Sequence, residues 1–195
     1  ALLVPIGTEA RTGLLCIAAL GGLMLRYTKQ RFLFIAGAGV LGLTALPFLP
    51  QSYYERMSTL AQPSGDESAS TRIAVWEWTI DYVAQKPLGG GFDAFRGNKF
   101  NYVMPVKQTD RNTTTVTYQP VEDKGRAYHS SFFEMLGEQG WPGLIIWLTL
   151  HALGIWQMER IQRRWKKAED EATRWIAPFA AALQMSALIY LVGAT

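Results

Sequence analysis

The sequence predicts an all-α, polytopic membrane protein fragment with four transmembrane helices and one large helical periplasmic loop. Three observations predict this fold class. Long apolar runs contain no charged residue, basic residues gather in two links between these runs, and most other polar residues fall in one long stretch. The mean hydropathy of +0.03 averages over these unlike segments. Because the chain begins with Ala1 and ends inside an apolar run, we interpret it as part of a larger protein.

The predicted membrane helices are the runs that lack Asp, Glu, Lys and Arg, namely 12–25, 32–50, 139–158 and 175–195. A helix that crosses the hydrocarbon core needs about 20 mostly apolar residues, and the last three runs have this length. The first run is shorter, but Arg11 and Arg26 at its ends can extend to the interface. The alternative, a soluble protein with buried helices, is disfavoured by the length of these uninterrupted runs.

The positions of Lys and Arg orient these helices. The link 26–31 holds three basic residues and no acidic one, and the link 159–174 is also rich in Lys and Arg. Cytoplasmic links carry an excess of Lys and Arg, so both links should be cytoplasmic. The stretch 51–138 and Arg11 then share the periplasmic side. A nucleic-acid partner is disfavoured, because each basic link joins two apolar runs.

The long polar stretch is predicted to contain a helix from about Arg72 to Gln85, after a Ser-rich segment at 58–71. An apolar stripe at spacings of three and four supports the helix; it consists of Ile73, Trp76, Ile80 and Val83. The residues that can cap its start are Ser68, Ser70 and Thr71.

After this helix, the sequence predicts a turn, then an irregular segment, and then a second helix. Gly89-Gly90-Gly91 follows a helix and lacks the Gly-Lys-Ser/Thr ending of a phosphate-binding P-loop, so it is interpreted as a turn. Residues 97–126 have no steady period and are predicted to be irregular, as functional loops of that length often are. A helix is predicted from Tyr128, weakened at Gly137 and Gly140 before the third apolar run.

Three residues of the outer side are candidates for chemistry. His129, at a predicted helix start, carries an imidazole that can take a proton near neutral pH, although a structural or capping histidine is the alternative. Arg72 is predicted in the first turn of its helix, where guanidinium and backbone amides suit a diphosphate; a solvated surface arginine is the alternative. Arg11 is either an interfacial anchor or a functional charge at the membrane boundary.

Other polar residues have simpler interpretations. His151 lies within the third apolar run and is predicted to pack or to bond between helices rather than to relay protons. Glu134 and Glu138 share a helix face and are interpreted as solvated or as partners for arginines. Cys16 is the single cysteine, which excludes a disulfide or cysteine-based metal site within the chain. Two histidines offer little for zinc, so neither metal nor cofactor is expected.

Three segments together resemble the O-antigen ligase/polymerase family. They are Arg72-Ile-Ala-Val-Trp76, Lys86-Pro-Leu-Gly-Gly-Gly-Phe92 and Tyr128-His-Ser-Ser-Phe-Phe-Glu-Met-Leu-Gly-Glu-Gln-Gly-Trp-Pro-Gly-Leu144. Their order and spacing match the family pattern of an Arg-x-x-x-Trp helix, a Pro-Leu-x-Gly-Gly-Phe turn and a His-Ser/Asn helix ending in Glu-x-Gly-x-x-Gly-Leu. The resemblance covers roughly residues 8–155 and is strongest to the O-glycosylation ligases associated with exosortase A systems.

The family also carries an arginine at the periplasmic start of an earlier membrane helix, usually within Ser-Arg-Gly. The corresponding stretch here is Glu9-Ala-Arg-Thr-Gly13, whose residues beside Arg11 depart from that pattern. On this resemblance, residues 1–195 form the C-terminal part of a ligase-like domain of the bacterial inner membrane, with its active site facing the periplasm.

The resemblance implies a reaction and a role for each candidate. A preassembled glycan passes from undecaprenyl diphosphate to the hydroxyl of a lipid or protein acceptor, with inversion and without a metal. Arg72 and Arg11 bind the diphosphate, and His129 activates the hydroxyl. The arginines would stabilise charge developing on the leaving oxygen. The motifs do not separate ligases from polysaccharide polymerases, and the alternative of another class is a membrane transporter or an envelope-assembly scaffold.

Overall fold

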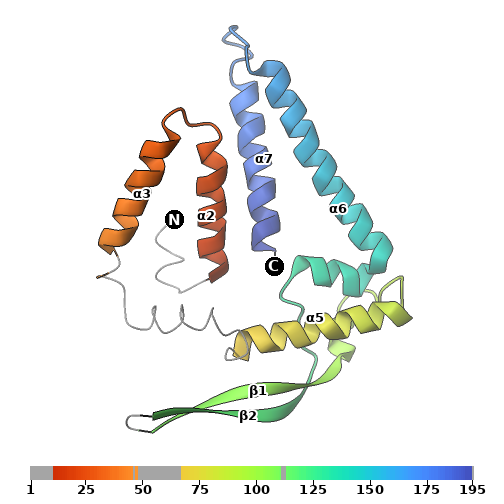
Figure 1. Cartoon of the computed structure of the whole chain (residues 1–195). Coiled ribbons are helices and arrows are strands. Elements are labelled where there is room, and N and C mark those ends of the chain that lie inside the picture. The colour runs from red at the N-terminus through yellow and green to blue at the C-terminus, as the bar shows by residue number, and fades with distance from the viewer. Residues whose placement is uncertain (1–10, 46, 48–66, 111–112, 195) are drawn as a thin grey trace. The chain divides into compact units, whose positions relative to one another are not determined.

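The computed structural model describes residues 11–45, 47, 67–110 and 113–194, without the side chains of residues 11, 45, 67–69, 104–110 and 113–116. The chain is mostly helical and divides into two compact units (Figure 1). The helical unit comprises Ala1–Leu49 and Trp147–Thr195, and the hairpin unit comprises Pro50–Ile146.

The helical unit is built from apolar helices. These are α2 (Arg11–Leu25), α3 (Arg31–Ala45), the part of α6 (Ser131–Trp165) from Trp147 onward, and α7 (Ile176–Gly193). Helices α2 and α7 pack closely: the Sγ of Cys16 lies 3.9 Å from the carbonyl oxygen of Ile189. Gly193 permits this approach, because a Cβ there would lie 3.2 Å from the same sulfur.

A helix occurs in each of the four predicted membrane runs. Among the described residues, only α7 is long and apolar enough to cross a membrane by length and composition. Helices α2 and α3 contribute the shorter apolar segments Thr12–Leu25 and Arg31–Thr44, and the run 139–158 lies within α6. The interpretation as four transmembrane helices therefore stays a prediction.

The hairpin unit contains α5 (Glu67–Gln85), a short 3₁₀ turn η4 (Ala94–Gly97), the strands β1 (Lys99–Asp110) and β2 (Thr113–Lys124), and the start of α6. The strands pair antiparallel, with Lys99 opposite Lys124 at one end and Asp110 opposite Thr113 at the other. Figure 1 shows this ribbon beside α5, which contacts β1.

The hairpin makes one prediction wrong: the stretch predicted to be irregular contains β1 and β2. The chain is mostly helical, as the predicted fold class requires, with this ribbon added to the helices. The β2 sequence is rich in Thr, Val and Tyr, which favour strands. However, Tyr102 is the one buried side chain among those described in the two strands and most of the others are exposed, so no long buried face imposes alternation of apolar and polar residues. Val103 and Tyr118 are accordingly exposed. Because apolar and polar residues do not alternate in this segment, its sequence does not predict a strand.

The core of the hairpin unit lies between α5, β1 and the start of α6. Val75, Thr79 and Val83 are the most deeply buried side chains of α5, and they share this core with Tyr102 and Leu136. The predicted stripe is therefore displaced, since two of its members, Ile73 and Ile80, are 44% and 49% exposed. The predicted start is wrong too: α5 begins at Glu67, so the predicted capping residues lie inside the helix.

Candidate active site

His129 occupies an exposed turn that the surrounding backbone holds in an unusual conformation. Its φ of 51° lies in the left-handed region, which costs a residue other than glycine about 1–3 kcal/mol. Both neighbours are buried, Tyr128 with 2% and Ser130 with 5% of their surface exposed. The carbonyl of Ser130 accepts the first bond of α6, from the Glu134 amide at 2.9 Å. The turn therefore presents the imidazole at the surface.

Trp76 of α5 connects the helix to this turn. Its indole Nε1 donates to the carbonyl oxygen of Tyr128 at 2.9 Å. Its ring also stacks on Phe133, with centroids 4.8 Å apart and planes 3° from parallel. Trp76 thus contacts the chain on both sides of His129, and it holds the turn against α5.

Asn98 fixes the segment that enters the turn. This buried side chain donates from Nδ2 to the Arg126 carbonyl at 2.8 Å and accepts the Arg126 amide at Oδ1 at 3.0 Å. The Gly125 amide donates to the Asn98 carbonyl at 3.2 Å. These bonds close the base of the hairpin, so the chain leaves β2 at a defined point just before Tyr128.

Arg72 lies one helical turn before Trp76 on the same helix face. Residues four apart in a helix have Cβ atoms about 5–6 Å apart. Arg72 is partly exposed, and no hydrogen bond or ion pair to its guanidinium occurs within the described part of the chain. Because α5 begins at Glu67, Arg72 lies beyond the first turn, so the free amides of the helix start do not support anion binding at this position.

Arg72 lies four residues before Trp76 in α5, and His129 directly follows Tyr128, whose carbonyl Trp76 binds. The third predicted site residue, Arg11, is the first residue of α2 in the helical unit. Its side chain lies outside the described residues, so its role in diphosphate binding stays a prediction.

The glycine turn after α5 contacts the first part of α6, at residues 137–141, through backbone atoms. Gly90 and Gly91 donate to the carbonyls of Gly137 and Glu138, both at 2.9 Å, and the Trp141 amide donates to the carbonyl of Pro87 at 3.0 Å. The interpretation of this segment as a turn is thereby confirmed. The second and third segments of the family resemblance therefore contact each other through these backbone hydrogen bonds.

Gly140 makes this contact possible. Its backbone is non-helical, with φ 65° and ψ −165°, so α6 consists of two helical segments that meet there. A Cβ at this position would collide with the carbonyl oxygen of Pro87. The glycine therefore allows one chain to approach the backbone of the other.

Glu138 secures the same turn from the side. Its Oε1 accepts the backbone amide of Asp93 at 2.9 Å, so its partner is a main-chain amide, whereas the sequence interpretation was a solvated residue or a partner for an arginine. Glu134, on the same helix face, is exposed, in agreement with its interpretation as a solvated residue.

Tyr128 and Asn98 were not singled out from sequence, although both hold the turn. Burial, followed by the negative charge of Glu138, raises the pKa of Tyr128, which therefore stays protonated at neutral pH. Its hydroxyl has no hydrogen-bond partner among the described residues and faces Gly137, where a Cβ would collide with it. The only sequence signal was the position of Tyr128 next to His129.

The second histidine belongs to the helical unit and has a packing role, as predicted. His151 Nδ1 lies 2.8 Å from the carbonyl oxygen of Trp147 in the preceding turn of α6. Its ring stacks on Tyr190 of α7 at 5.6 Å. Within the described ranges, no three His, Cys, Asp or Glu side chains are grouped so that they could hold a metal ion.

The comparisons with known proteins give one match. A family model described as O-Antigen ligase matches residues 1–148, more than half of the chain. This range includes Arg11, Arg72 and His129 together with the whole glycine-turn contact. Comparisons with curated proteins and with solved structures gave no significant match.

Proposed function

Because the chain belongs to the O-antigen ligase family, we propose that it transfers a preassembled glycan from an undecaprenyl diphosphate carrier to the hydroxyl of a lipid or protein acceptor. The observation that carries the proposal is the turn at His129, whose left-handed backbone exposes the imidazole between two buried neighbours. Strained backbone of this kind clusters at active sites, where the surrounding structure compensates for its cost.

His129 acts as the general base. The acceptor hydroxyl attacks the anomeric carbon of the first sugar while its proton passes to the imidazole. The bond between that carbon and the diphosphate oxygen breaks, so the configuration inverts. Imidazole is the side chain that enzymes most often use for proton transfer near neutral pH.

Arg72 stabilises the leaving diphosphate. Its guanidinium has no partner within the described residues, which leaves its donors free for phosphate oxygens. A guanidinium offers a planar fork that matches two such oxygens. Negative charge develops on the leaving oxygen as the bond breaks, and fixed cations at that point lower the barrier without a metal. Arg11 is the second cation of this proposal.

The apolar surfaces of the helical unit support a membrane location with four spanning helices. In α7, only 17% of the membrane-compatible window is buried, unlike the core helix of a soluble protein. The large apolar side chains of α3, including Phe32, Leu33 and Leu41, are also exposed. Exposed apolar area of this extent is unfavourable in water and suits lipid or further membrane helices.

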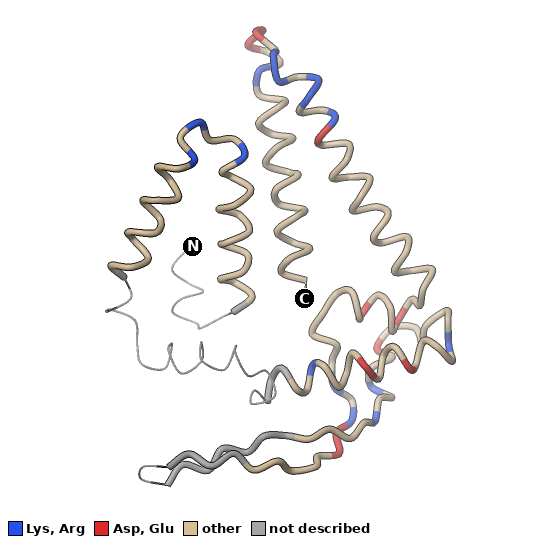
Figure 2. Tube along the Cα trace, in the orientation of Figure 1, with Lys and Arg blue, Asp and Glu red and all other residues tan. Residues whose placement is uncertain are grey.

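The two basic links support the proposed orientation. Figure 2 shows Lys and Arg at the α2–α3 link and at the α6–α7 link. The Arg26 guanidinium lies 2.7 Å from the Glu159 carboxylate, so both links belong to the same end of the helical unit. An excess of Lys and Arg is typical of the cytoplasmic side, which supports the proposal that the hairpin unit faces the periplasm.

The test is glycan transfer in cells that lack the native enzyme and produce the full-length protein with His129→Ala. We expect near-complete loss of transfer with normal membrane insertion, because no other described side chain of the turn can take the proton. Glu134→Ala is the matched control, since Glu134 is exposed on the first turn of α6, and it should transfer normally. Normal transfer by His129→Ala would contradict the proposal, and it is the result expected of a transporter or scaffold.

The product distinguishes the ligase from the alternative within the family. A ligase places glycan on a lipid or protein acceptor, whereas a polymerase lengthens the carrier-linked chain. Glycan that appears only as longer carrier-linked chains would replace the ligase by the polymerase and leave the roles of His129 and Arg72 unchanged.

A further inference from the structure

A cavity of about 440 Å³ lies in the helical unit, at the two basic links. None of the residues that line it has a role in the proposed transfer reaction. The α2–α3 link, the end of α6 and the start of α7 line it together. Its charged lining residues are Arg26, Glu159, Arg163 and Lys166. Its apolar wall consists of Ala177, Pro178 and Ala181 at the start of α7.

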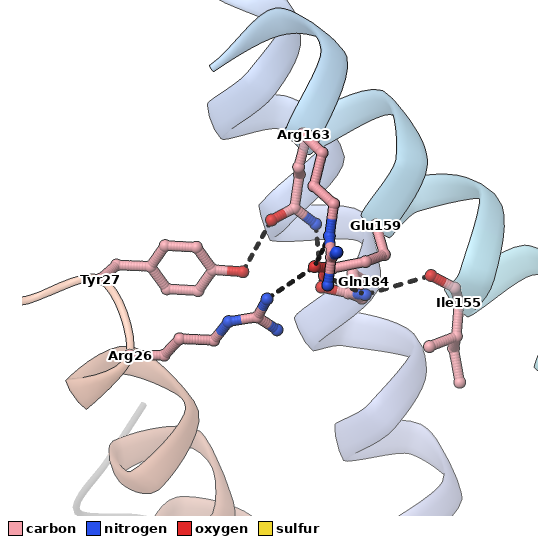
Figure 3. A network of polar contacts seen from close by, with 7 residues as sticks. Arg26, Tyr27, Ile155, Glu159, Arg163 and Gln184 are labelled. Carbon is pink, nitrogen blue, oxygen red and sulfur yellow. Dashed lines mark hydrogen bonds and ion pairs between the residues drawn. The ribbon is translucent and has the colours of Figure 1, made fainter. Parts of the chain in front are cut away.

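One carboxylate in this cavity is shared by two guanidinium groups. Arg26 donates to Glu159 Oε1 at 2.7 Å, and Arg163 Nε donates to the same oxygen at 2.8 Å (Figure 3). Lys166 has no ion pair in the described part of the chain. The lining therefore carries three cations against one anion, and it is positively charged at neutral pH.

A polar network holds Glu159 in place, and through it the guanidinium groups of Arg26 and Arg163. The Tyr27 hydroxyl donates to Gln162 Oε1 at 2.8 Å, and Gln162 Nε2 donates to Gln184 Oε1 at 2.8 Å. Gln184 in turn donates to Glu159 Oε2 at 3.2 Å and to the Ile155 carbonyl at 3.1 Å. The chain of bonds spans the link, α6 and α7, so the guanidinium groups are preorganised before any ligand binds.

The same cations keep donors for a ligand. A guanidinium has five N–H donors, whereas Arg26 and Arg163 each make one bond to Glu159. Their side chains are 53% and 78% exposed, so the remaining donors are accessible. A phosphate group with two free oxygens matches such a fork, and Lys166 adds a point charge beside it.

We propose that this cavity binds the phosphate group of an anionic phospholipid, with the glycerol and upper acyl carbons against Ala177, Pro178 and Ala181. The inference rests on the membrane placement of the proposed function, in which this end faces the cytoplasmic leaflet. Anionic lipids there attract basic residues, and basic pockets between membrane helices at that surface bind anionic head groups. The ligand is a structural lipid and takes no part in glycan transfer.

The experiment measures lipid binding to the full-length protein in detergent by native mass spectrometry, with phosphatidylglycerol, phosphatidylcholine and inorganic phosphate as probes. The variant is Arg163→Gln with Lys166→Gln. The matched control is Arg164→Gln with Lys167→Gln, which removes the same charge from exposed residues of the same segment that do not line the cavity. Equal melting temperatures of the two double variants without added lipid confirm that both fold.

The wild-type protein and the control should bind phosphatidylglycerol in preference to phosphatidylcholine, and the cavity variant should bind it roughly tenfold or more weakly. Equal affinity of the cavity and control variants would overturn the proposal, as would equal binding of the two lipids. Complete competition by inorganic phosphate would show a free-anion site instead of a lipid site. The measurement involves no glycan, so its failure and that of the transfer reaction are independent.

Discussion

The proposed reaction depends on the contacts that position two residues, His129 and Arg72. His129 is presented by its backbone, because Tyr128 and Ser130 on either side are buried. Arg72 lies one turn from Trp76, whose indole bonds to the Tyr128 carbonyl at 2.9 Å. The proposed role of His129 therefore depends on the geometry of its turn. The proposed role of Arg72 depends on the chemistry of its own side chain.

Replacement of Arg72 by lysine tests the diphosphate role. Lysine keeps the charge but loses the fork, so one charge-assisted hydrogen bond to the donor is lost and kcat/KM should fall about tenfold. The loss should appear with the carrier-linked donor as the varied substrate in a reconstituted transfer assay. Arg96→Lys is the control, since Arg96 is exposed and pairs with Asp93 at 3.0 Å, and its kcat/KM should not change. An unchanged kcat/KM in Arg72→Lys would remove the diphosphate role.

The resemblance supplied His129 and Arg72, but the residues that position them were largely invisible in the sequence. Asn98 acts through main-chain partners 28 residues away, and no local spacing encodes such a contact. Glu138 accepts the amide of Asp93, which is 45 residues away, a partner that neither sequence interpretation of this residue included. Long-range bonds to the backbone depend on tertiary structure, and periodicity does not report them.

At the scale of elements, the glycine turn and the break in α6 form one contact. The helices were predictable from apolar runs and spacing, whereas the hairpin was not, because an exposed ribbon has no alternating pattern to detect. The helix start at Glu67 was also missed, since local Ser and Thr residues offered equally plausible caps.

Gly140→Ala and Gly91→Ala test the contact between the turn and α6. Both glycines have positive φ, 65° and 80°, but a Cβ at Gly91 would meet nothing within 4 Å, whereas one at Gly140 would collide with the Pro87 carbonyl. Gly91→Ala should therefore cost about 1–2 kcal/mol from strain, and Gly140→Ala clearly more. Melting temperatures in detergent measure the difference. Equal losses in the two variants would show that the close approach is unimportant.

The contact between α2, α6 and α7 should depend on pH through Glu159. Hydrogen bonds from Arg26, Arg163 and Gln184 lower the pKa of this carboxyl to about 2 from an ordinary value of 4.5. Because the folded pKa lies below the unfolded one, the carboxylate adds stability above about pH 4.5, and this contribution is lost as the pH falls towards about 2.

The melting temperature of the wild-type protein should therefore fall more steeply over that pH interval than the melting temperature of Glu159→Gln. Glu169→Gln is the control, because Glu169 is an exposed acid of the α6–α7 link, and its curve should follow the wild type. Parallel curves for wild type and Glu159→Gln would show that the network does not stabilise the folded state.

At the scale of the whole molecule, the family is established and the reaction is proposed. The O-Antigen ligase match extends over both units, and the three sequence segments of the resemblance lie in the hairpin unit around Trp76 and the glycine turn. The distribution of Lys and Arg and the exposed apolar helices support the membrane orientation that is proposed for this chain. The central claim of the proposed reaction is that His129 takes the proton of the acceptor hydroxyl.

The most direct test is the transfer rate of His129→Gly in the reconstituted reaction, measured together with its melting temperature. Glycine accepts a φ of 51° without strain, so the variant should fold at least as well as the wild type. It should still bind the carrier-linked donor through Arg72 but transfer no glycan at a measurable rate. Transfer at the wild-type rate by this stably folded variant would contradict the role of His129 as the general base.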